Sequence, residues 1–524
     1  MTHLRKLHFL RNLNSMPCLK YFTLPVGCSF RACSSRSRQS ISSLNPKTHD
    51  NFRQNALYGQ PVAQTHPHII NAGEVLPGIQ LEEVKLRRHA LLEAIRAYCA
   101  VNIDKNIKSH IIIIPAANKK YMSDKIPYVF RQNSDFLYLS GCQEPESVLV
   151  MEIDGSSKHK TTIFLRPKDK HAEMWDGSRT GVELASDVFG VEQAMDIGEL
   201  MDYLCRYSFA YPNALVWYGK NCSDLSNVSH AIKDMFNCEP RSPTELIHQL
   251  RVIKSPSEIN LMRKSCEIAS QAINRTMKQS FPGINEHYIF ASVDYYARLG
   301  GANFLAYPPV VAGGTNATTI HYINNNQIIK NGELVLLDAG CEYHGYTSDI
   351  TRTWPVNGTF SEPQRVLYEV LQLVQSELLS CLLSTEGETL DRLFDTMCMK
   401  IGKYLQEIKL IPGSLSGVEL SRAAYKFCPH HASHYLGMDV HDTPLISRNI
   451  RLKPGMVCTV EPGIYIAKDR TDVPAEFKGL GLRIEDDVLI KSCNEIEVLT
   501  AQCVKDKIQL ENILSSTDKQ EQVK

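Results

Sequence analysis

Two aspartates follow strand-like segments in the stretch LVLLDAGCEYHGYTSDITRTWPV, which runs from Leu334 to Val356. The apolar run before Asp338 predicts a buried strand, and the alternating segment around Asp349 predicts a half-buried one. A two-residue loop at Tyr343–His344 places the two carboxylates directly opposite each other, with Cβ atoms about 4.5–5.5 Å apart. Like charges at that distance destabilise a hairpin, so the pair predicts a bound cation, a shared proton or open water. A solvated hairpin with two surface aspartates is the alternative.

Three further segments of the C-terminal half carry residue types that bind metal ions or move protons. They read PHHASHYLGMDVHD, GMVCTVEPGIYI and GLGLRIEDDVLI, and each lies on or beside an apolar segment. Any one of them alone is weak evidence, because a single histidine is usually structural and E-P-G is a common way to leave a strand. Together with the two aspartates they supply four carboxylates and one imidazole as candidate metal ligands: Asp338, Asp349, His434, Glu461 and Glu485.

This set of side chains predicts a pair of divalent ions. Burying several carboxylates without counter-charge costs several kcal/mol per ion, and bound cations offset that cost. Oxygen-dominated ligation with one imidazole suits Mn²⁺ or a similar hard ion, with Zn²⁺ and Co²⁺ as alternatives by affinity order. Two ions roughly 3.5–4 Å apart, bridged by carboxylates, form the usual arrangement of two-metal hydrolysis.

The half of the chain that precedes these segments alternates between strand and helix patterns, which predicts an α/β domain. A helical pattern covers Leu81–Ala100. Strand-like runs follow at residues 111–114, 147–154 and 161–165, and the last two flank Asp154–Gly155, a strong turn signal.

A sharp helix start in KSPSEINLMRKSCEIASQAI marks the beginning of a second domain. Ser255 is the expected N-cap, Pro256 occupies the first helical position, and Glu258 completes a capping box. Apolar residues then recur at helical spacing. A second long amphipathic helix is predicted over about Pro363–Leu383.

The bulk composition excludes several classes of protein. A chain of 524 residues with 43% hydrophobic and 22% charged residues is typical of a globular protein of two or three domains. It contains no uninterrupted apolar run long enough for a transmembrane helix, so a membrane span is not expected. It also contains no basic stripe with interleaved aromatic residues, so a nucleic acid partner is not expected. Its 16 cysteines are scattered singly, which predicts free thiols.

The first 49 residues contain five Arg, three Lys and eight Ser, and no acidic residue precedes Asp50. This composition predicts a mitochondrial transit peptide. The rest of the chain, with 49 basic and 57 acidic residues, is mildly acidic. A basic tail without a targeting role is the alternative, and a secretory signal is disfavoured because Lys20 and Pro25 interrupt its apolar run.

The series D-A-G, S-D-I-T-R-T, H-x-x-x-H-x-L-G-x-D-V-H-D, E-P-G-x-Y and R-I-E-D resembles the dinuclear metallopeptidases of the pita-bread fold, which include aminopeptidase P, prolidase and methionine aminopeptidase. The segments FRQNSDFLYLSGCQEPESVLV and AEMWDGSRTGVELASDVFGVEQAM resemble the N-terminal domain of aminopeptidase P, and GQPVAQTHPHIINAGEVLPGI resembles its mitochondrial subgroup. The resemblance implies an α/β N-terminal domain followed by an α+β pita-bread (creatinase/aminopeptidase-like) catalytic domain. We expect them at residues 51–245 and 250–505, between a transit peptide over 1–50 and a polar tail over 506–524.

The resemblance also implies a role for each candidate ligand. Asp338 and Asp349 match the ligands of one metal ion, with Asp349 and Glu485 bridging both ions. His434 and Glu461 match the ligands of the other ion. Glu461 also resembles the carboxylate that takes a proton from the attacking water.

Further residues match positions around the metals in this family. His441 resembles the histidine that donates to the scissile carbonyl or its oxyanion. His321 matches an active-site histidine upstream of the first aspartate, and His430 is the weaker member of its histidine pair. Tyr307 and Arg483 match positions that line the substrate site or brace the ligands. Substrate contacts are implied for Tyr307 and Arg483, for His441, and for three of the ligands: Asp338, Asp349 and His434.

The implied activity is a metal-dependent aminopeptidase that releases the first residue of peptides and favours proline at the second position. A prolidase-like dipeptidase is the nearest alternative, and only the N-terminal half argues against it. A metal-free binding module and a creatinase-like hydrolase are further alternatives, which the intact ligand set disfavours. The expected partners are peptides or protein N-termini with proline at position two, and a second copy in a homodimer. The expected location is the mitochondrial matrix, with a cytosolic pool as an alternative, and imported mitochondrial proteins are plausible substrates.

Overall fold

The computed structural model describes residues 57–103, 109–154, 158–219, 226–383 and 387–515. The predicted transit peptide over 1–50 lies outside these residues, and so does Gly155 of the predicted turn. Among the residues described, no helix combines the length and the apolar character needed to cross a bilayer. The cysteines of these segments are all unpaired thiols, as the sequence predicts.

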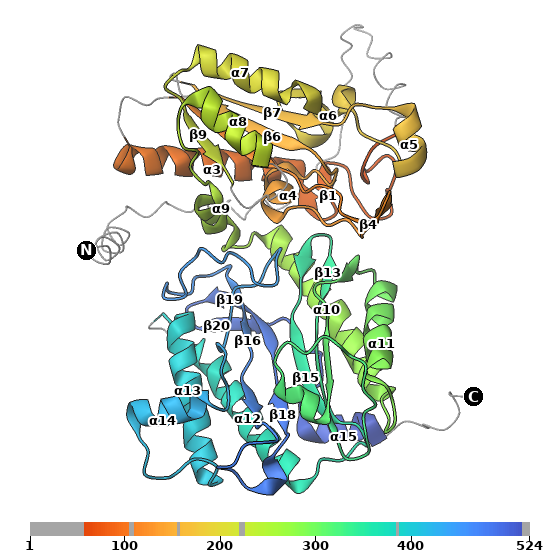
Figure 1. Ribbon diagram of the computed structural model, residues 1–524, viewed down its shortest axis with the longest axis vertical. Coiled ribbons are helices and arrows are strands. Elements are labelled where there is room, and N and C mark those ends of the chain that lie inside the picture. The colour runs from red at the N-terminus through yellow and green to blue at the C-terminus, as the bar shows by residue number, and fades with distance from the viewer. Residues whose placement is uncertain (1–56, 104–108, 155–157, 220–225, 384–386, 516–524) are drawn as a thin grey trace, which may run out of the picture. The chain divides into compact units, whose positions relative to one another are not determined.

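The N-terminal domain is built on a five-stranded sheet with the order β8-β7-β6-β3-β9 (Figure 1). Its strands are β3 His110–Pro115, β6 Val148–Ile153, β7 His159–Leu165, β8 Gln193–Asp196 and β9 Leu215–Tyr218. Neighbours pair antiparallel except β3 with β9 and β7 with β8, which are parallel. The three strands predicted from apolar runs in this half are therefore confirmed.

Helices cover both faces of this sheet, which explains why its central strands are apolar throughout. Ile112 and Ile114 belong to a core cluster that includes buried residues of α3 (Leu81–Asn102) and α4 (Ser134–Ser140). Ile111 and Ile113 face the opposite way and pack with α7 (Leu200–Ala210) and α8 (Ser226–Phe236). The helix predicted from Leu81 is confirmed as α3.

Shorter elements complete this half of the chain. They are β1 Glu74–Leu76, β2 Ile79–Gln80, β4 Tyr121–Ser123, β5 Ile126–Pro127, α5 Lys170–Asp176, α6 Val182–Phe189, the 3-10 turn Ile197–Glu199 and α9 Thr244–Arg251. The helix α9 runs across the predicted domain boundary at 245–250, and that boundary stays a prediction.

The predicted helix start at Ser255 is confirmed in detail. Helix α10 spans Pro256–Lys278, with Pro256 at its first position. The Ser255 hydroxyl accepts from the Glu258 amide at 3.2 Å, and the Glu258 carboxylate accepts from the Ser255 amide at 2.9 Å. Both bonds of the capping box are therefore present.

The second domain folds as antiparallel sheets covered by long helices, among them α10 and α12 (Figure 1). Its strands are β10 Phe304–Leu305, β11 Val310–Gly313, β12 Leu334–Ala339, β13 Cys341–Tyr343, β14 Tyr346–Thr347, β15 Ile350–Pro355, β16 Val457–Val460, β17 Gly463–Tyr465, β18 Gly481–Arg483, β19 Asp486–Ser492 and β20 Glu495–Val498. The other helices are α11 Glu286–Leu299, α12 Glu362–Cys381, α13 Leu390–Glu407, α14 Gly417–Tyr425 and α15 Lys507–Ser515, with 3-10 turns at Gly314–Thr318 and Ala475–Phe477.

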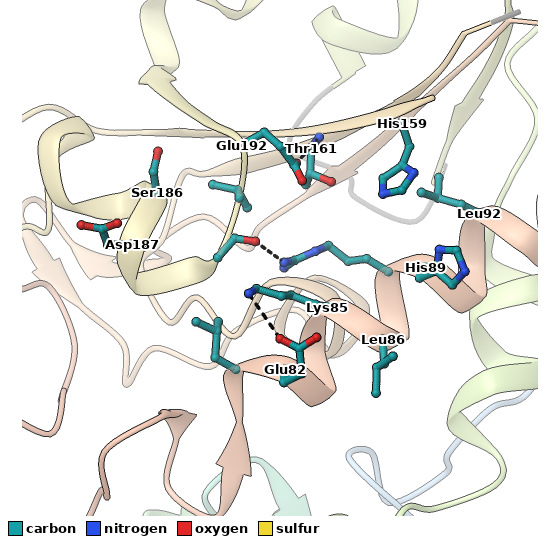
Figure 2. Close-up of a pocket in the computed structure, with 14 residues that line it drawn as sticks. Glu82, Lys85, Leu86, His89, Leu92, His159, Thr161, Ser186, Asp187 and Glu192 are labelled. Atoms are coloured by element: carbon teal, nitrogen blue, oxygen red, sulfur yellow. Dashed lines mark hydrogen bonds and ion pairs between the residues drawn. The ribbon is translucent and has the colours of Figure 1, made fainter. Parts of the chain in front are cut away.

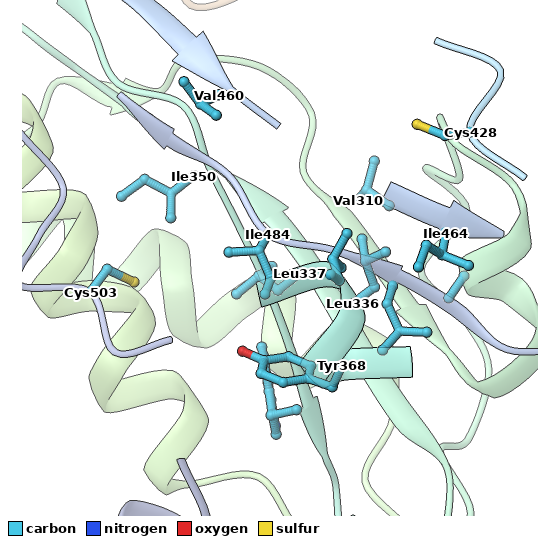
Figure 3. Close-up of a cluster of buried hydrophobic side chains, with 14 of the residues drawn as sticks. Val310, Leu336, Leu337, Ile350, Tyr368, Cys428, Val460, Ile464, Ile484 and Cys503 are labelled. Atoms are coloured by element: carbon cyan, nitrogen blue, oxygen red, sulfur yellow. The ribbon is translucent and has the colours of Figure 1, made fainter. Parts of the chain in front are cut away.

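A buried apolar core joins these sheets to the helices (Figure 3). Leu336 and Leu337 of β12, Ile484 beyond β18 and Tyr368 of α12 belong to this single cluster. The predicted amphipathic helix near Pro363–Leu383 is confirmed as α12. The segment predicted as a polar tail starts with α15, whose Leu510 and Leu514 are buried, although residues 516–524 lie outside the description.

The hairpin between the two aspartates has a different register from the one predicted, so that prediction is wrong. Its two-residue loop lies one position further along the chain, at His344 and Gly345, which both have positive φ values of 49° and 86°. Such a loop is the turn type that matches the twist of paired strands, and it favours glycine. Asp338 therefore pairs with Thr351, and Asp349 lies one residue before β15.

Candidate metal centre

The five candidate ligands come from five separate segments that meet around β12 and β15. Asp338 lies near the end of β12, and Asp349 immediately precedes β15. Glu461 follows β16, and Glu485 lies between β18 and β19. His434 belongs to a loop that runs alongside β16, because its amide donates to Thr459 Oγ1 at 3.1 Å.

The side chains of this group converge, and each is largely buried. His434 Nε2 lies 3.3 Å from Asp349 Oδ2 and 3.8 Å from Glu461 Oε1. One ligand atom each from Asp349, His434 and Glu485 lies within 4.8 Å of the others. Glu485 is 2% exposed. The side chains of the other four candidate ligands expose 7–16% of their area.

Asp338 joins the group through Tyr307 and Arg483. The Tyr307 hydroxyl lies 2.5 Å from Oδ1 of Asp338 and 2.5 Å from Oδ1 of Asp349. Arg483 Nη2 donates to Asp338 Oδ2 at 2.5 Å. The two aspartates that the sequence placed opposite each other are thus brought together diagonally, by a shared tyrosine.

The electrostatics of the group show an excess of negative charge. Burial raises the pKa of Glu461 to about 7, although His434 and Arg483 oppose the shift. Burial and the neighbouring carboxylates raise the pKa of Glu485 well above its usual range. Burial alone would lower the pKa of His434, but the hydrogen bond to Asp349 and the charge of Glu461 raise it to about 9. Four buried carboxylates face one arginine and one imidazole, so this donor set fits divalent cations.

Three residues that sequence reasoning did not single out brace the centre. Thr351 donates to Glu485 Oε2 at 2.6 Å and accepts from Arg483 Nε at 2.8 Å. Asp487 Oδ2 accepts from the Asp349 amide at 2.9 Å. Tyr465 accepts from Arg483 Nη1 at 2.8 Å. The sequence signal that could have identified Thr351 was its position two residues after Asp349, because residues two apart in a strand lie on the same face.

The remaining predicted histidines lie at the edge of the ligand group. His430 Nε2 is 3.0 Å from the Tyr465 hydroxyl, and its Nδ1 is 3.7 Å from Glu461 Oε2. Burial and the charge of Arg483 lower the pKa of His430 to about 4, so its ring is neutral. The ring of His441 lies 4.5 Å from that of His434, centroid to centroid. His321 is exposed and interacts electrostatically with His430 and His441.

A cavity of about 580 Å³ lies elsewhere, in the N-terminal domain between α3, α6 and β7 (Figure 2). Its charged groups have partners within the chain. Lys85 pairs with Glu82 at 3.3 Å, and Glu192 accepts from the Thr161 amide at 2.7 Å. The buried Arg88 donates to carbonyls at the carboxyl ends of α4 and α6. This cavity therefore lacks the uncompensated charge that distinguishes the ligand group.

Comparisons with known proteins agree with this geometry. The model of metallopeptidase family M24 matches residues 260–492, and that of the aminopeptidase P N-terminal domain matches residues 84–217. Xaa-Pro aminopeptidase 3 of Mus musculus is 41% identical over 478 residues, which cover 88% of this chain and 92% of that protein. The chain belongs to the Xaa-Pro aminopeptidase family of M24 metallopeptidases. The aminopeptidase P N-terminal domain and the pita-bread catalytic domain predicted from the motifs are thereby confirmed.

Two further relatives of this aminopeptidase P family member bear on its function. The mitochondrial intermediate cleaving peptidase 55 of Arabidopsis thaliana is 38% identical, with 92% of each chain covered. The structure of aminopeptidase P from E. coli with the inhibitor Pro-Leu is 31% identical, has a TM-score of 0.76, and is matched over 84% of this chain and 99% of that one. The chain is therefore a metallopeptidase, as the motifs predicted.

Proposed function

We propose that this metallopeptidase cleaves the first residue from peptides that carry proline at the second position, with a centre that holds two divalent ions. The observation that carries the proposal is the convergence of four carboxylates and one imidazole from five segments, with Arg483 and His434 as the positive charges paired with them among the residues that the structure describes. Asp338 and Asp349 would hold one ion, and His434 and Glu461 the other. Asp349 and Glu485 would bridge both.

The ions, when bound, supply Lewis-acid polarisation of the scissile carbonyl and activation of a water as nucleophile. The chain's own residues then handle protons and orientation. Glu461 takes the proton of the attacking water, a role open to a buried carboxylate that lies beside His434 in the ligand group. His441 donates a hydrogen bond to the carbonyl oxygen as negative charge develops there. His321, which interacts electrostatically with His430 and His441, contacts the peptide.

Arg483 and Tyr307 hold the two aspartate ligands of the centre in position during this reaction. Arg483 donates to Asp338, Thr351 and Tyr465 at once, so its guanidinium fixes the position of one ligand. Tyr307 bridges the two aspartates. The Tyr465 hydroxyl can in turn donate to His430, which holds that imidazole against Glu461.

A panel of short peptides tests the activity. The metal-loaded enzyme should release glycine from Gly-Pro-Pro and leave the dipeptide Gly-Pro largely intact, because an aminopeptidase needs a residue beyond proline. Gly-Ala-Pro is the matched control for the proline ring. Preferential cleavage of Gly-Pro would instead identify a prolidase-like dipeptidase, and cleavage of none of the three would contradict the proposal.

We propose Mn²⁺ as the native ion, on the basis of the oxygen-rich donor set. Purification without added metal, followed by elemental analysis and reconstitution with Mn²⁺, Zn²⁺ or Co²⁺, tests this choice. Higher turnover with Zn²⁺ at matched occupancy would contradict it.

We propose that the enzyme acts in the mitochondrial matrix and trims the N-termini of imported proteins. The acid-free N-terminal segment and the mitochondrial name of one relative support this location. A fusion of residues 1–55 to a fluorescent reporter should reach the matrix and lose its N-terminus. The matched control replaces six basic residues with glutamine: Arg5, Lys6, Arg11, Arg31, Arg36 and Arg38. A reporter in the secretory pathway, or intact in the cytosol, would contradict the location.

We also propose a homodimer, supported by an exposed apolar surface in the N-terminal domain. The β4–β5 hairpin and helix α5 bury none of their residues, and Lys119 beside the hairpin pairs with Asp176 of α5 at 3.1 Å. Surfaces of this kind mark interaction sites, and an isolated two-stranded hairpin is marginally stable alone. The exposed apolar side chains are Tyr121, Met122, Ile126, Tyr128, Val129, Met174 and Trp175.

Solution mass measurements test the dimer. Trp175→Ser combined with Tyr128→Ser should shift the enzyme toward the monomer. Phe209→Ser on α7, at a side chain that is 81% exposed, is the matched control. A wild-type enzyme that is monomeric at micromolar concentration would contradict the proposal.

A further inference from the structure

The imidazole of His441 is exposed and makes few contacts of its own, so its position depends on the backbone that carries it. Among the described residues, the imidazole makes the ring contact with His434 and accepts or donates no hydrogen bond. A side chain that must meet a developing charge needs a defined orientation. The residues that follow His441 therefore have to supply that orientation.

Asp442, the next residue, is held by two buried cations. Its Oδ1 accepts from Arg251 Nη2 at 2.5 Å and its Oδ2 accepts from Lys254 Nζ at 3.0 Å. The three side chains are 1–3% exposed. The Asp442 amide also donates to the Tyr435 carbonyl at 2.9 Å, which ties the loop back to its own beginning.

The loop around this ion cluster is packed so closely that one position requires glycine. A Cβ atom at Gly437 would lie 2.5 Å from Asp442 Oδ2 and 2.9 Å from Lys254 Cε. The backbone of Gly437 is also anchored, since its carbonyl accepts from the amide of Thr347 at 2.9 Å and from its hydroxyl at 2.9 Å. Asp442 and Lys254 therefore leave no space for a side chain at position 437 of the loop.

Thr443, on the other side of Asp442, adopts a conformation that its side chain disfavours. Its φ value is 48°, and the residue is fully buried. A β-branched residue is unfavourable in the left-handed region and persists there only where surrounding contacts impose it. Thr443 directly follows Asp442, so the backbone close to His441 is held against its local preference.

The N-terminal domain contributes to the same cluster. Arg251 also donates to Asp439 at 2.8 Å and to Asp135 of α4 at 2.7 Å. Ser134 of α4 donates to Asp439 at 2.6 Å, and Arg131 donates to the same carboxylate at 3.1 Å. Residues of both domains therefore form hydrogen bonds with the loop that carries His441.

We propose that Asp442 is a positioning residue for His441, and that Arg251 and Lys254 hold it in place. The proposal rests on the role given to His441 under the proposed function. Asp442 itself does not contact the ligand group in the contacts above. It acts by fixing the backbone from which the imidazole projects.

A double-mutant cycle on the full-length, metal-loaded enzyme tests this role. Asp442→Asn, which keeps the shape and removes the charge, should lower kcat on Gly-Pro-Pro by about 10–100-fold, with KM and metal content within about threefold of wild type. In the His441→Ala background the same change should lower kcat by less than about threefold, because residues that act through one another are not additive. Asp472→Asn, at an exposed carboxylate paired with Arg470, is the matched control and should leave kcat unchanged.

Each outcome decides the proposal. An equal loss of kcat in both backgrounds, or a wild-type kcat for Asp442→Asn, would overturn it while leaving the proposed activity intact. A wild-type kcat for His441→Ala would overturn it together with the proposed role of His441, and absent cleavage by the wild type would overturn the proposed function as a whole. Should Asp442→Asn fail to fold, Lys254→Met, which leaves the Arg251 contact in place, decides the question by the same cycle, with an expected loss of about 3–10-fold.

Discussion

Two buried charge clusters lie within the catalytic domain, and they differ in how their charges balance. In the ligand group, four carboxylates face Arg483 and His434. In the loop cluster, Arg251 and Lys254 face the buried Asp442 and the partly exposed Asp439. The first cluster raises the pKa of Glu461 to about 7, whereas in the second Arg251 and Arg131 overcome the effect of burial and lower the pKa of Asp439 to about 2. A buried excess of one sign indicates a site for ions of the opposite sign, and a balanced cluster indicates a structural role.

The largest effect should come from removing a carboxylate of the unbalanced cluster. Glu485→Ala is expected to abolish binding of at least one ion and to lower kcat/KM by far more than the 10–100-fold typical of residues that only support a ligand. Metal content and peptide cleavage are measured on the same preparation. A variant that keeps two ions per chain and wild-type turnover would show that the excess charge serves another purpose.

Removing His441 should affect turnover and spare the ions. A hydrogen-bond donor that acts in the transition state contributes about 10²–10⁴-fold, so His441→Ala should lower kcat by that factor at unchanged metal content. His431→Ala, at an exposed histidine of the same segment, is the matched control. Loss of metal from the His441 variant would make His441 a ligand.

The sequence predicted those features of the molecule that depend on local pattern. The capping box of α10 was readable because its residues lie three apart in the chain. The ligand types were readable because carboxylates at the ends of apolar runs are unusual. The hairpin loop was predicted one residue too early, so the partner of Asp338 was misjudged by two residues. Gly345 carried the signal for the true position, since a glycine suits the positive φ that the loop needs.

Other parts could not be read from local pattern. Thr351 meets Arg483 because β15 and β18 lie side by side, as the bond from Thr353 Oγ1 to the Arg483 carbonyl at 3.0 Å shows. Tyr465 meets Arg483 because β17 pairs with β18. Arg251 meets Asp442 across 191 positions of the chain. Such pairings follow from tertiary packing, which no hydrophobic period or turn signal encodes.

Without metal, the ligand group should make the protein less stable as the pH rises. The folded-state pKa of Glu461, about 7, lies above the value of about 4.3 in an unfolded chain. The folded state therefore binds more protons than the unfolded state between these values, and the free energy of unfolding falls as the pH rises through them. Thermal melts of the metal-free enzyme at pH 5 and pH 8 should show this loss, which Glu461→Gln should reduce and bound ions should remove. A metal-free enzyme that is more stable at pH 8 would contradict it.

The loop cluster should show the opposite pH dependence, with the smallest effect of all. The pKa of Asp439, about 2, lies below the value of about 3.9 in an unfolded chain, so its stabilisation is complete above pH 4 and is lost as the pH falls toward 2. Because the Asp439 side chain is 34% exposed, its ion pairs contribute only about 0.2–1 kcal/mol. Urea unfolding should therefore find Asp439→Asn less stable than the wild type by up to about 1 kcal/mol at pH 7, by roughly half as much at pH 3, and nearly equal to it at about pH 2. Asp124→Asn, in the exposed loop between β4 and β5, is the control. A difference that grows toward pH 3 would show that Asp439 is stabilised by something other than Arg251 and Arg131, and the contrast between the two clusters would fail.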